Sequence, residues 1–224
     1  MERKIIKTGD GSVTIHLPEW DEQYHSKHGA VQEALHVFLK TGLDFYLEQQ
    51  SKSEVSILEI GFGTGLNAFL TALQAEKLQL KVNYTGVEAY PIAAAELKDL
   101  NYAEVVSEEN KKEVLLKMHE TGWEQEFEIT PFFSLTKEQK KFQEIEKNDQ
   151  FDLVYFDAFG ARVQPELWTE EIFKIMYRAM KPQGVLVTYA AKGSVRRAMQ
   201  AVGFLVERLP GPPGKREMLR ATKG

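Results

Sequence analysis

Residues 55–67 read VSILEIGFGTGLN, and this stretch decides the fold. An apolar, β-branched run is followed by three glycines at every second position and then by residues with helical spacing, which predicts a strand, a tight turn and a helix. The spacing is G-x-G-x-G, unlike the G-x-G-x-x-G of dinucleotide binders, and no basic residue follows it as in a P-loop. Both phosphate-binding interpretations are therefore disfavoured, and the turn indicates another ligand that approaches the backbone closely.

The rest of the chain continues this alternation of strand and helix. Further strand-like runs lie at 82–88 (VNYTGVE), 127–130 (FEIT), 151–157 (FDLVYFD) and 184–190 (GVLVTYA). Helical patterns lie at 66–76, 92–100, 107–119, 136–145, 165–180 and 194–201. This order predicts an α/β fold with a Rossmann-like, doubly wound, mostly parallel sheet covered by helices on both faces. The runs 203–209 and 216–221 flank a GPPG turn and predict a C-terminal antiparallel hairpin at the sheet edge.

The first fifty residues precede this repeat and predict a small N-terminal extension. Short alternating stretches around Ile5 and at 13–17 indicate strands, and residues 31–47 have apolar side chains at helical spacing. We therefore divide the chain into an extension at 1–50 that packs on the core and a main domain at 51–224.

Composition excludes several functional classes. The chain has no cysteine, which removes disulfides, thiolate metal sites and sulfur nucleophiles. The N-terminus lacks a secretory apolar core and no run is long enough to span a membrane, so we expect a cytoplasmic protein. Its five histidines form no metal-type pair and no G-x-S-x-G elbow occurs, so we expect no metal and no serine hydrolase.

Charge is distributed unevenly along the chain. The whole sequence carries −5, but residues 172–224 contain eleven basic and two acidic side chains, so this segment carries +9 and the remainder −14. Such asymmetry favours a polyanionic partner. The alternative is an ordinary solvated basic face.

Two carboxylates follow predicted strands at the edge where a doubly wound sheet binds ligands. Glu88 ends the second strand and can accept hydrogen bonds from two ribose hydroxyls, so with the glycine loop it indicates an adenosine-type ligand; alternatively it is only solvated. Asp157 ends the fourth strand and is placed to orient an amine that attacks a sulfonium methyl group. Phe62 and Phe159 can offer ring faces to a cation or a base, whereas Phe156 is expected to pack in the core.

These residues resemble known families. The E-x-G-x-G-x-G loop, the acid after the second strand and Lys181-Pro182-Gln183-Gly184 resemble class I S-adenosylmethionine-dependent methyltransferases. A narrower resemblance covers most of the chain and points to the methyltransferase domain of the tRNA 5-methylaminomethyl-2-thiouridine biosynthesis (MnmC/MnmD) family. Its blocks here are DEQYHS (21–26), HGA (28–30), IGFGTGLN (60–67), DAFG (157–160), PELWT (165–169), TYAAKGSVRR (188–197), AVGF (201–204) and GKREML (214–219).

The resemblance implies methyl transfer from S-adenosylmethionine to the amine of 5-aminomethyl(-2-thio)uridine at the tRNA wobble position, with Asp157 as the active-site acid. The cofactor-binding residues it implies, together with the loop, are Glu59, Gly61, Phe62, Gly63, Gly65, Asn67, Glu88 and Asp157. The residues expected to contact the substrate, including the phosphates of the anticodon stem-loop, are Tyr24, Ser26, Glu33, Phe159, Lys192, Arg196, Arg197, Lys215 and Arg216.

The chain also departs from the family pattern. D-G-F-A-P is replaced by DAFGA at 157–161, and the Gly-Asp expected after the third strand is absent from TPFFS at 130–134. No flavin-dependent domain is recognised, so the chain resembles a stand-alone form that needs no flavin. The sequence specifies neither the oligomeric state, nor the tRNAs used, nor whether the uridine must be thiolated.

Two other functions fit part of the pattern. One is a methyltransferase or aminopropyl transferase for a small-molecule amine, which shares the loop, Glu88 and Asp157 but leaves the basic C-terminal segment unexplained. The other is a non-catalytic binding module, which the intact loop and Asp157 disfavour.

Overall fold

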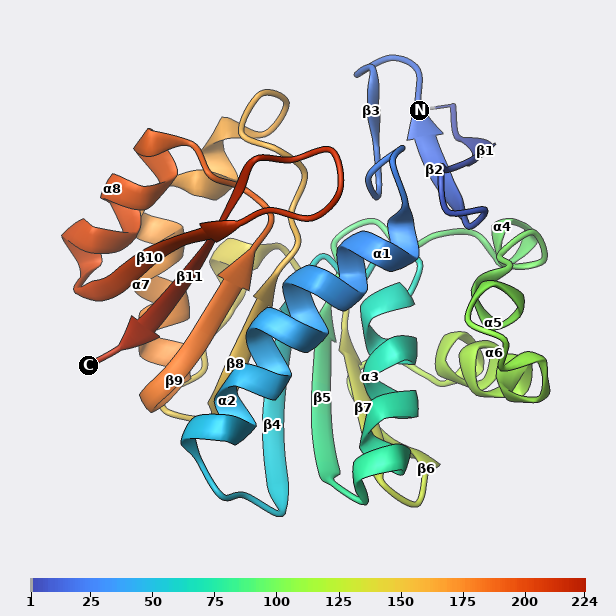
Figure 1. The fold of residues 1–224 in the computed structure, drawn as a ribbon, viewed down its shortest axis with the longest axis horizontal. Helices are drawn as coiled ribbons and strands as arrows, with labels where there is room; N and C mark the ends of the chain where they lie inside the picture. Colours follow the sequence, from blue (N-terminus) through green and yellow to red (C-terminus); the bar gives the residue numbers. More distant parts are fainter. Residues whose placement is uncertain (1) are drawn as a thin grey trace.

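A mixed eight-stranded sheet forms the centre of the computed structural model, which describes residues 2–224 (Figure 1). The spatial order is β10-β11-β9-β8-β4-β5-β7-β6. The strands β4 (Glu54–Ile60), β5 (Lys81–Val87), β7 (Phe133–Glu138), β8 (Phe151–Phe156) and β9 (Met180–Thr188) pair in parallel. The strands β6 (Glu126–Thr130), β10 (Phe204–Pro210) and β11 (Glu217–Lys223) pair antiparallel. The predicted doubly wound fold with a C-terminal hairpin is confirmed.

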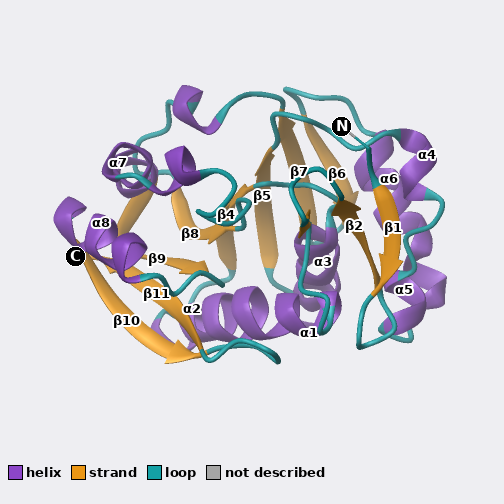
Figure 2. Ribbon diagram, turned by 90° about the horizontal axis from the view of Figure 1, so that it is seen from above, coloured by secondary structure: helices purple, strands orange, loops and turns teal. Residues whose placement is uncertain are grey.

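Helices cover both faces of this sheet because side chains alternate along its buried strands. Val55 and Ile57 of β4 pack in one apolar cluster, whereas Leu58 and Ile60 pack in the other. Figure 2 shows α1 and α2 on one side of the sheet and α7 on the other. The first face carries α1 (Ala30–Ala34), η1 (Leu35–Asp44), α2 (Phe45–Gln49) and α3 (Leu66–Leu78), and the second carries α7 (Glu170–Ala179) and α8 (Gly193–Val202).

The N-terminal segment forms a small three-stranded sheet and then a long helix. The strands are β1 (Lys4–Lys7), β2 (Val13–Leu17) and β3 (Glu22–Gln23). The predicted helix at 31–47 is found as the continuous run α1-η1-α2, whose central part η1 has π-type hydrogen bonds. The first residue of the predicted extension, Met1, lies outside the described residues, and the division at residue 50 stays a prediction.

Short helices connect the strands. They are α4 (Ala94–Leu97), α5 (Tyr102–Val105), η2 (Glu109–Lys111), α6 (Lys112–Glu120), η3 (Phe142–Glu144) and η4 (Pro165–Trp168). Within residues 2–224, no helix has the length and apolarity needed to cross a bilayer.

The predicted helix at 136–145 is wrong. Residues 133–138 form β7, which is the third parallel strand, and only Phe142–Glu144 form a helical turn. The run 127–130, which we took as that third strand, is the antiparallel edge strand β6. The side chains of Phe133 and Leu135 are buried in the core of the protein. Tertiary packing therefore overrides the local helical pattern. The residues that follow the third parallel strand are therefore those after Glu138, not those at 130–134.

Candidate active site

The glycine loop follows β4, the strand at which the order of successive strands in the sheet changes direction. The central strand β4 pairs with β5 on one side and β8 on the other, so the carboxyl ends of these strands open a crevice. Backbone hydrogen bonds fasten the loop there: Gly61 N and Phe62 N donate to Val87 O at 3.0 and 3.1 Å, and Asp157 N donates to Ile60 O at 2.9 Å. The loop and Asp157 therefore share one rigid edge.

Positive φ angles explain why the loop needs glycine. The φ angles of Gly61, Gly63 and Gly65 are +90°, +49° and +73°. A Cβ atom at position 61 would lie 2.7 Å from the Asp157 carbonyl oxygen, so a side chain would separate β4 from β8. Gly65 is the N-cap of α3 and has no side chain to cap the helix. The backbone N–H groups in the first turn of α3 are therefore free to bind a ligand.

Glu88 lies beside this loop at the end of β5. Its Oε2 accepts a hydrogen bond from Gly63 N at 3.0 Å and its Oε1 accepts one from Tyr90 N at 2.8 Å. Each carboxylate oxygen keeps a second lone pair for a ligand hydroxyl. A cavity of about 120 Å³ opens here, lined by Phe62, Gly63, Glu88, Pro91, Ile92, Ala94, Leu97, His119, Trp123 and Lys137.

Seven of these ten lining residues were not predicted from the sequence, among them His119, Trp123 and Lys137. Burial lowers the pKa of His119 to about 4, so its ring is neutral and Nε2 donates to Thr64 O at 2.9 Å. Lys137 Nζ donates to His119 O at 2.9 Å and lies 5.0 Å from the Trp123 ring centroid. Burial lowers the pKa of this ammonium to about 8. Lys137 belongs to β7, the strand that the sequence pattern concealed, which is why it was missed.

Asp157 is held by a chain of polar contacts below the crevice. Asn67 Nδ2 donates to Asp157 Oδ2 and to Glu59 Oε1, both at 2.9 Å. Burial raises the pKa of Asp157 to about 7; nearby Glu33 raises it further, while Asn67 and Lys215 oppose the shift. Burial also raises the pKa of Glu59 well above its usual range. Asp157 can therefore gain and lose a proton near neutral pH.

Glu59 and Asn67 are buried beneath the loop, with 1% and 2% of their surface exposed. The Asn67 side chain bonds to both Glu59 and Asp157, which places it to orient the Asp157 carboxyl group. Their predicted contact with a cofactor stays a prediction.

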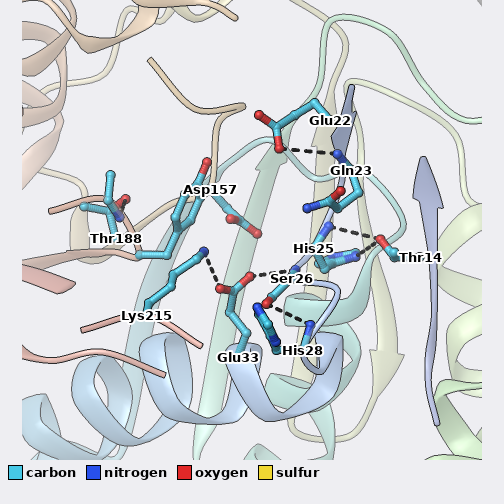
Figure 3. A network of polar contacts seen from close by, with 12 residues as sticks. Thr14, Glu22, Gln23, His25, Ser26, His28, Glu33, Asp157, Thr188 and Lys215 are labelled. Atoms are coloured by element: carbon cyan, nitrogen blue, oxygen red, sulfur yellow. Dashed lines mark hydrogen bonds and ion pairs between the residues drawn. The ribbon is translucent and has the colours of Figure 1, made fainter. Parts of the chain in front are cut away.

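A second polar cluster faces Asp157 from α1 and from the turn between β10 and β11 (Figure 3). The buried Glu33 accepts hydrogen bonds from Ser26 N at 3.0 Å and from Lys215 Nζ at 2.5 Å. The Lys215 ammonium also lies 3.8 Å from the centroid of the Tyr189 ring. The predicted substrate residues Ser26, Glu33 and Lys215 are thus brought together beside Asp157, and Tyr189 joins them unpredicted.

Aromatic side chains pack around the 157–160 segment and against the glycine loop. Phe159 packs edge-to-face with Tyr24 and with Trp20, at centroid distances of 5.1 and 5.7 Å. Trp168 Nε1 donates to Phe159 O at 2.8 Å and fixes this segment. Phe156, by contrast, is fully buried against Trp168, as predicted for a core residue.

The predicted phosphate-binding residues divide into two groups. Lys192, Arg197 and Arg216 are exposed and Arg196 is partly exposed, and within residues 2–224 none of the four forms an ion pair with a carboxylate. They lie where α8 starts and where β11 begins, next to the carboxyl end of β9. Lys215 differs, because it turns inward and pairs with Glu33.

Two further observations delimit the site. A larger cavity of about 490 Å³ lies between η1 and α3, lined by apolar residues such as Leu39 and Leu70 together with rim charges, and none of the predicted site residues lines it. We therefore assign the site to the smaller cavity, where backbone donors and carboxylates converge. In residues 2–224, no group of three or more His, Asp or Glu side chains is arranged to hold a metal ion.

Comparison with known proteins identifies a family. A family model described as S-adenosyl-L-methionine-dependent methyltransferase matches residues 113–224, half of the chain. The protein named tRNA 5-methylaminomethyl-2-thiouridine biosynthesis bifunctional protein MnmC from Marinomonas sp. (strain MWYL1) is 30% identical over 218 residues, which covers 91% of this chain and 31% of that protein. The protein of the same name from Hydrogenovibrio crunogenus is 29% identical over 212 residues, covering 89% and 31%. The chain spans about a third of the length of these relatives.

Solved structures agree with this family. The crystal structure of MNMC2 from Aquifex aeolicus matches with a TM-score of 0.79 and 26% identity, over 100% of this chain and 70% of that chain. Spermidine synthase from Thermotoga maritima matches with a TM-score of 0.61 and 15% identity, over 99% and 69%, which is a likeness of fold alone. The family resemblance predicted from the sequence is confirmed.

Proposed function

Because the chain belongs to the S-adenosyl-L-methionine-dependent methyltransferase family, we propose that it methylates the amine of 5-aminomethyl(-2-thio)uridine at the wobble position of tRNA. The product is 5-methylaminomethyl(-2-thio)uridine. The observation that carries the proposal is the Asp157 carboxyl group held by Asn67 at the crevice, with its pKa raised by burial to about 7, in a chain whose relatives are named for tRNA 5-methylaminomethyl-2-thiouridine biosynthesis. A near-neutral carboxyl is suited to amine chemistry.

The crevice fits the cofactor that the family uses. Gly63 packs against the Tyr24 ring, and a Cβ atom at this position would lie 3.0 Å from that ring, so glycine lets the loop backbone border the crevice closely. The carboxylate of Glu88 faces the same cavity as the indole of Trp123 and can accept hydrogen bonds from ribose hydroxyls. The adenosine end of S-adenosylmethionine would lie in this cavity, and when bound the cofactor supplies a methyl group activated by its sulfonium charge.

Asp157 contributes to the reaction by accepting a proton from the substrate ammonium. A primary alkylammonium has a pKa of about 10.4, so an ordinary aspartate with a pKa of about 3.9 is a weaker base by roughly 9 kcal/mol. Raising the pKa of Asp157 to about 7 halves that deficit, to about 5 kcal/mol. The Asp157 carboxylate takes one proton from the ammonium and leaves the nitrogen lone pair free to form the new N–C bond as the S–C bond breaks. Asn67 holds the carboxylate in place during this transfer.

The surface around the crevice suits a nucleic acid. Lys192, Arg196, Arg197 and Arg216 present cations at its rim, which can contact phosphates of the anticodon stem-loop. The Tyr24 and Phe159 rings border the crevice and can pack against an extruded base.

Methyl transfer changes no oxidation state of the protein, so we propose that this step needs neither flavin nor metal, and that it takes place in the cytoplasm, where tRNA is found.

The acceptor is tested by offering three substrates to the same enzyme. The protein is incubated with S-adenosylmethionine and either aminomethyl-bearing tRNA, the same tRNA unmodified, or the diamine putrescine, and S-adenosylhomocysteine release is followed. We expect release only with aminomethyl-bearing tRNA. Release with putrescine and not with tRNA would refute the tRNA proposal in favour of a small-molecule amine, and failure to bind S-adenosylhomocysteine would indicate a non-catalytic module.

The basic rim is tested by removing its charges, with a control at the opposite edge of the sheet. Replacing Lys192, Arg196, Arg197 and Arg216 by Gln should weaken tRNA binding by at least tenfold at moderate salt and flatten its dependence on salt concentration. The control replaces Lys52 and Lys81, two exposed cations near the amino ends of β4 and β5, and should leave binding unchanged. Equal losses in both variants would contradict a specific phosphate-binding rim.

A further inference from the structure

The Lys215 ammonium lies in a binding site that the protein itself provides. Its Nζ donates to Glu33 Oε2, and it lies 3.8 Å from the centroid of the Tyr189 ring, a distance at which the ring face attracts a cation. Figure 3 shows Glu33, Lys215 and Asp157 directed toward the same space. A carboxylate, an aromatic face and a second carboxyl group thus surround one primary ammonium.

The groups that receive this ammonium are fixed without it. Glu33 is 5% exposed, belongs to α1 and is held by the hydrogen bond from Ser26 N at 3.0 Å. Tyr189 follows β9, and its hydroxyl donates to Ala158 O at 2.8 Å. Asp157 is held by Asn67. The receiving side of the site is therefore preorganised by a helix and two strand ends.

The ammonium itself is brought by a loop. Lys215 lies in the turn between β10 and β11, where its backbone N donates to Pro212 O at 2.9 Å and Gly214 has a φ of +83°. Its side chain is 31% exposed, whereas that of Glu33 is 7% exposed. Withdrawing this side chain requires rotation of its own flexible bonds and leaves the receiving groups in place.

The chemistry of the occupant matches the substrate of the proposed reaction. A lysine side chain ends in –CH2–NH3+, which is the group that an aminomethyl uridine carries on its base. We propose that Glu33, Tyr189 and Asp157 form a primary-ammonium subsite, and that Lys215 fills this subsite until the aminomethyl group of the substrate displaces it. The inference rests on the proposed function for the identity of the displacing group.

The buried charge of Glu33 explains why Lys215 occupies the subsite in the free protein and how the subsite selects its substrate. An unpaired carboxylate as buried as Glu33 is costly, so Lys215 supplies the compensating charge in the free protein. A substrate ammonium can replace Lys215 without leaving Glu33 unpaired. Uridine without the aminomethyl group has no cation to exchange and leaves Lys215 in place. The site thereby discriminates between tRNA that carries the amine and tRNA that lacks it.

The test fills the vacated subsite with a simple alkylammonium. Lys215→Ala and wild type are titrated with n-butylammonium chloride, and the melting temperature is recorded, with n-butanol and sodium chloride as controls. We expect a saturable rise in the variant, of roughly 3 °C at ten times the Kd, and no rise in wild type. Glu33→Gln combined with Lys215→Ala should abolish the response, because the charged receptor is removed.

Other outcomes overturn the inference. An equal rise in wild type, or an equal rise with n-butanol, would show that binding does not depend on the vacated ammonium subsite. Absence of a rise in both Lys215→Ala and Lys215→Ser, two variants that each vacate the subsite, would show that the subsite takes no external amine. These measurements use neither tRNA nor cofactor, so they succeed or fail independently of the proposed methyl transfer.

Discussion

A single substitution, Asp157→Asn, should lower the methyl-transfer activity and raise the stability of the folded protein. Asparagine keeps the size of the side chain and an acceptor oxygen for Asn67 Nδ2, but it cannot ionise. Loss of the proton acceptor should reduce methyl transfer by about 10² to 10⁴-fold, the usual contribution of a positioned base. Cofactor affinity should change little, because Glu88 and the glycine loop remain.

The gain in stability follows from the pKa of the same group. Between pH about 4 and 7 the folded protein keeps the Asp157 proton that the unfolded chain has lost, so the contribution of Asp157 to stability falls as pH rises through this range. A shift from 3.8 to about 7 corresponds to about 4 kcal/mol. Above pH about 7, Asp157→Asn should recover most of this free energy of unfolding, which corresponds to a rise in melting temperature of roughly 5–10 °C.

The assay is thermal unfolding of cofactor-free wild type and variant from acid to mildly alkaline pH. The difference in melting temperature should be largest above the Asp157 pKa of about 7 and disappear toward pH about 3, where aspartate is neutral in both states. Asn67→Ala is the matched control, because it removes the hydrogen bond that Asp157→Asn keeps and retains the ionisable group of Asp157. A variant that is less stable than wild type above pH 7, or a difference independent of pH, would refute the reasoning.

Three further substitutions test other parts of the structure. Glu88→Ala should weaken S-adenosylhomocysteine binding by about 10- to 100-fold in calorimetry, because two hydroxyl acceptors are lost; unchanged affinity would contradict its role. Gly65→Ala should cost about 1–3 kcal/mol in urea unfolding, because φ is +73° and the new Cβ would lie 3.1 Å from His119 Nε2; a neutral effect would contradict this strain. Asp152→Ala should cost about 3–5 kcal/mol by the same assay, because the buried carboxylate accepts hydrogen bonds from Tyr46 and Lys181; a cost below about 1 kcal/mol would show that this network is dispensable.

The sheet and the first half of the site could be predicted because their signals are local. The glycine spacing at 61–65 marks the turn, and Glu88 and Asp157 stand directly after apolar runs whose period identifies them as buried strands. Once the strands are parallel, their carboxyl ends must share one edge, so the meeting of these residues follows from topology.

The rest of the cavity beside Glu88 was not predictable from local pattern. Strand β7 ends in Lys137 and Glu138, two charged residues that are nevertheless buried, so its end lacks the apolar signal of a strand. Lys137 lines the cavity, so a polar residue stands where the usual alternation of a buried strand would place an apolar one. His119 and Trp123 reach the cavity through tertiary packing that no local period encodes.

The pairing of Glu33 with Lys215 shows the same limit. The two residues are 182 positions apart, and sequence pattern assigned Lys215 to phosphates because it lies in a basic segment. Its inward direction is set by the turn between β10 and β11 and by a buried carboxylate with an aromatic face beside it. Of the basic residues from 172 onward, five are used in ion pairs, so net charge alone overstates the surface available to a polyanion.

The position of the transferred methyl group tests the central claim most directly. Wild type and Asp157→Asn are incubated above pH about 7 with S-adenosylmethionine bearing a trideuterated methyl group and with aminomethyl-bearing tRNA, and the digested nucleosides are analysed by tandem mass spectrometry. We predict that the label lies on the aminomethyl nitrogen of the wobble uridine in wild type and is nearly absent in the variant. Label on another atom or nucleoside, or equal labelling by the variant, would contradict the assignment of Asp157 and its crevice to this reaction.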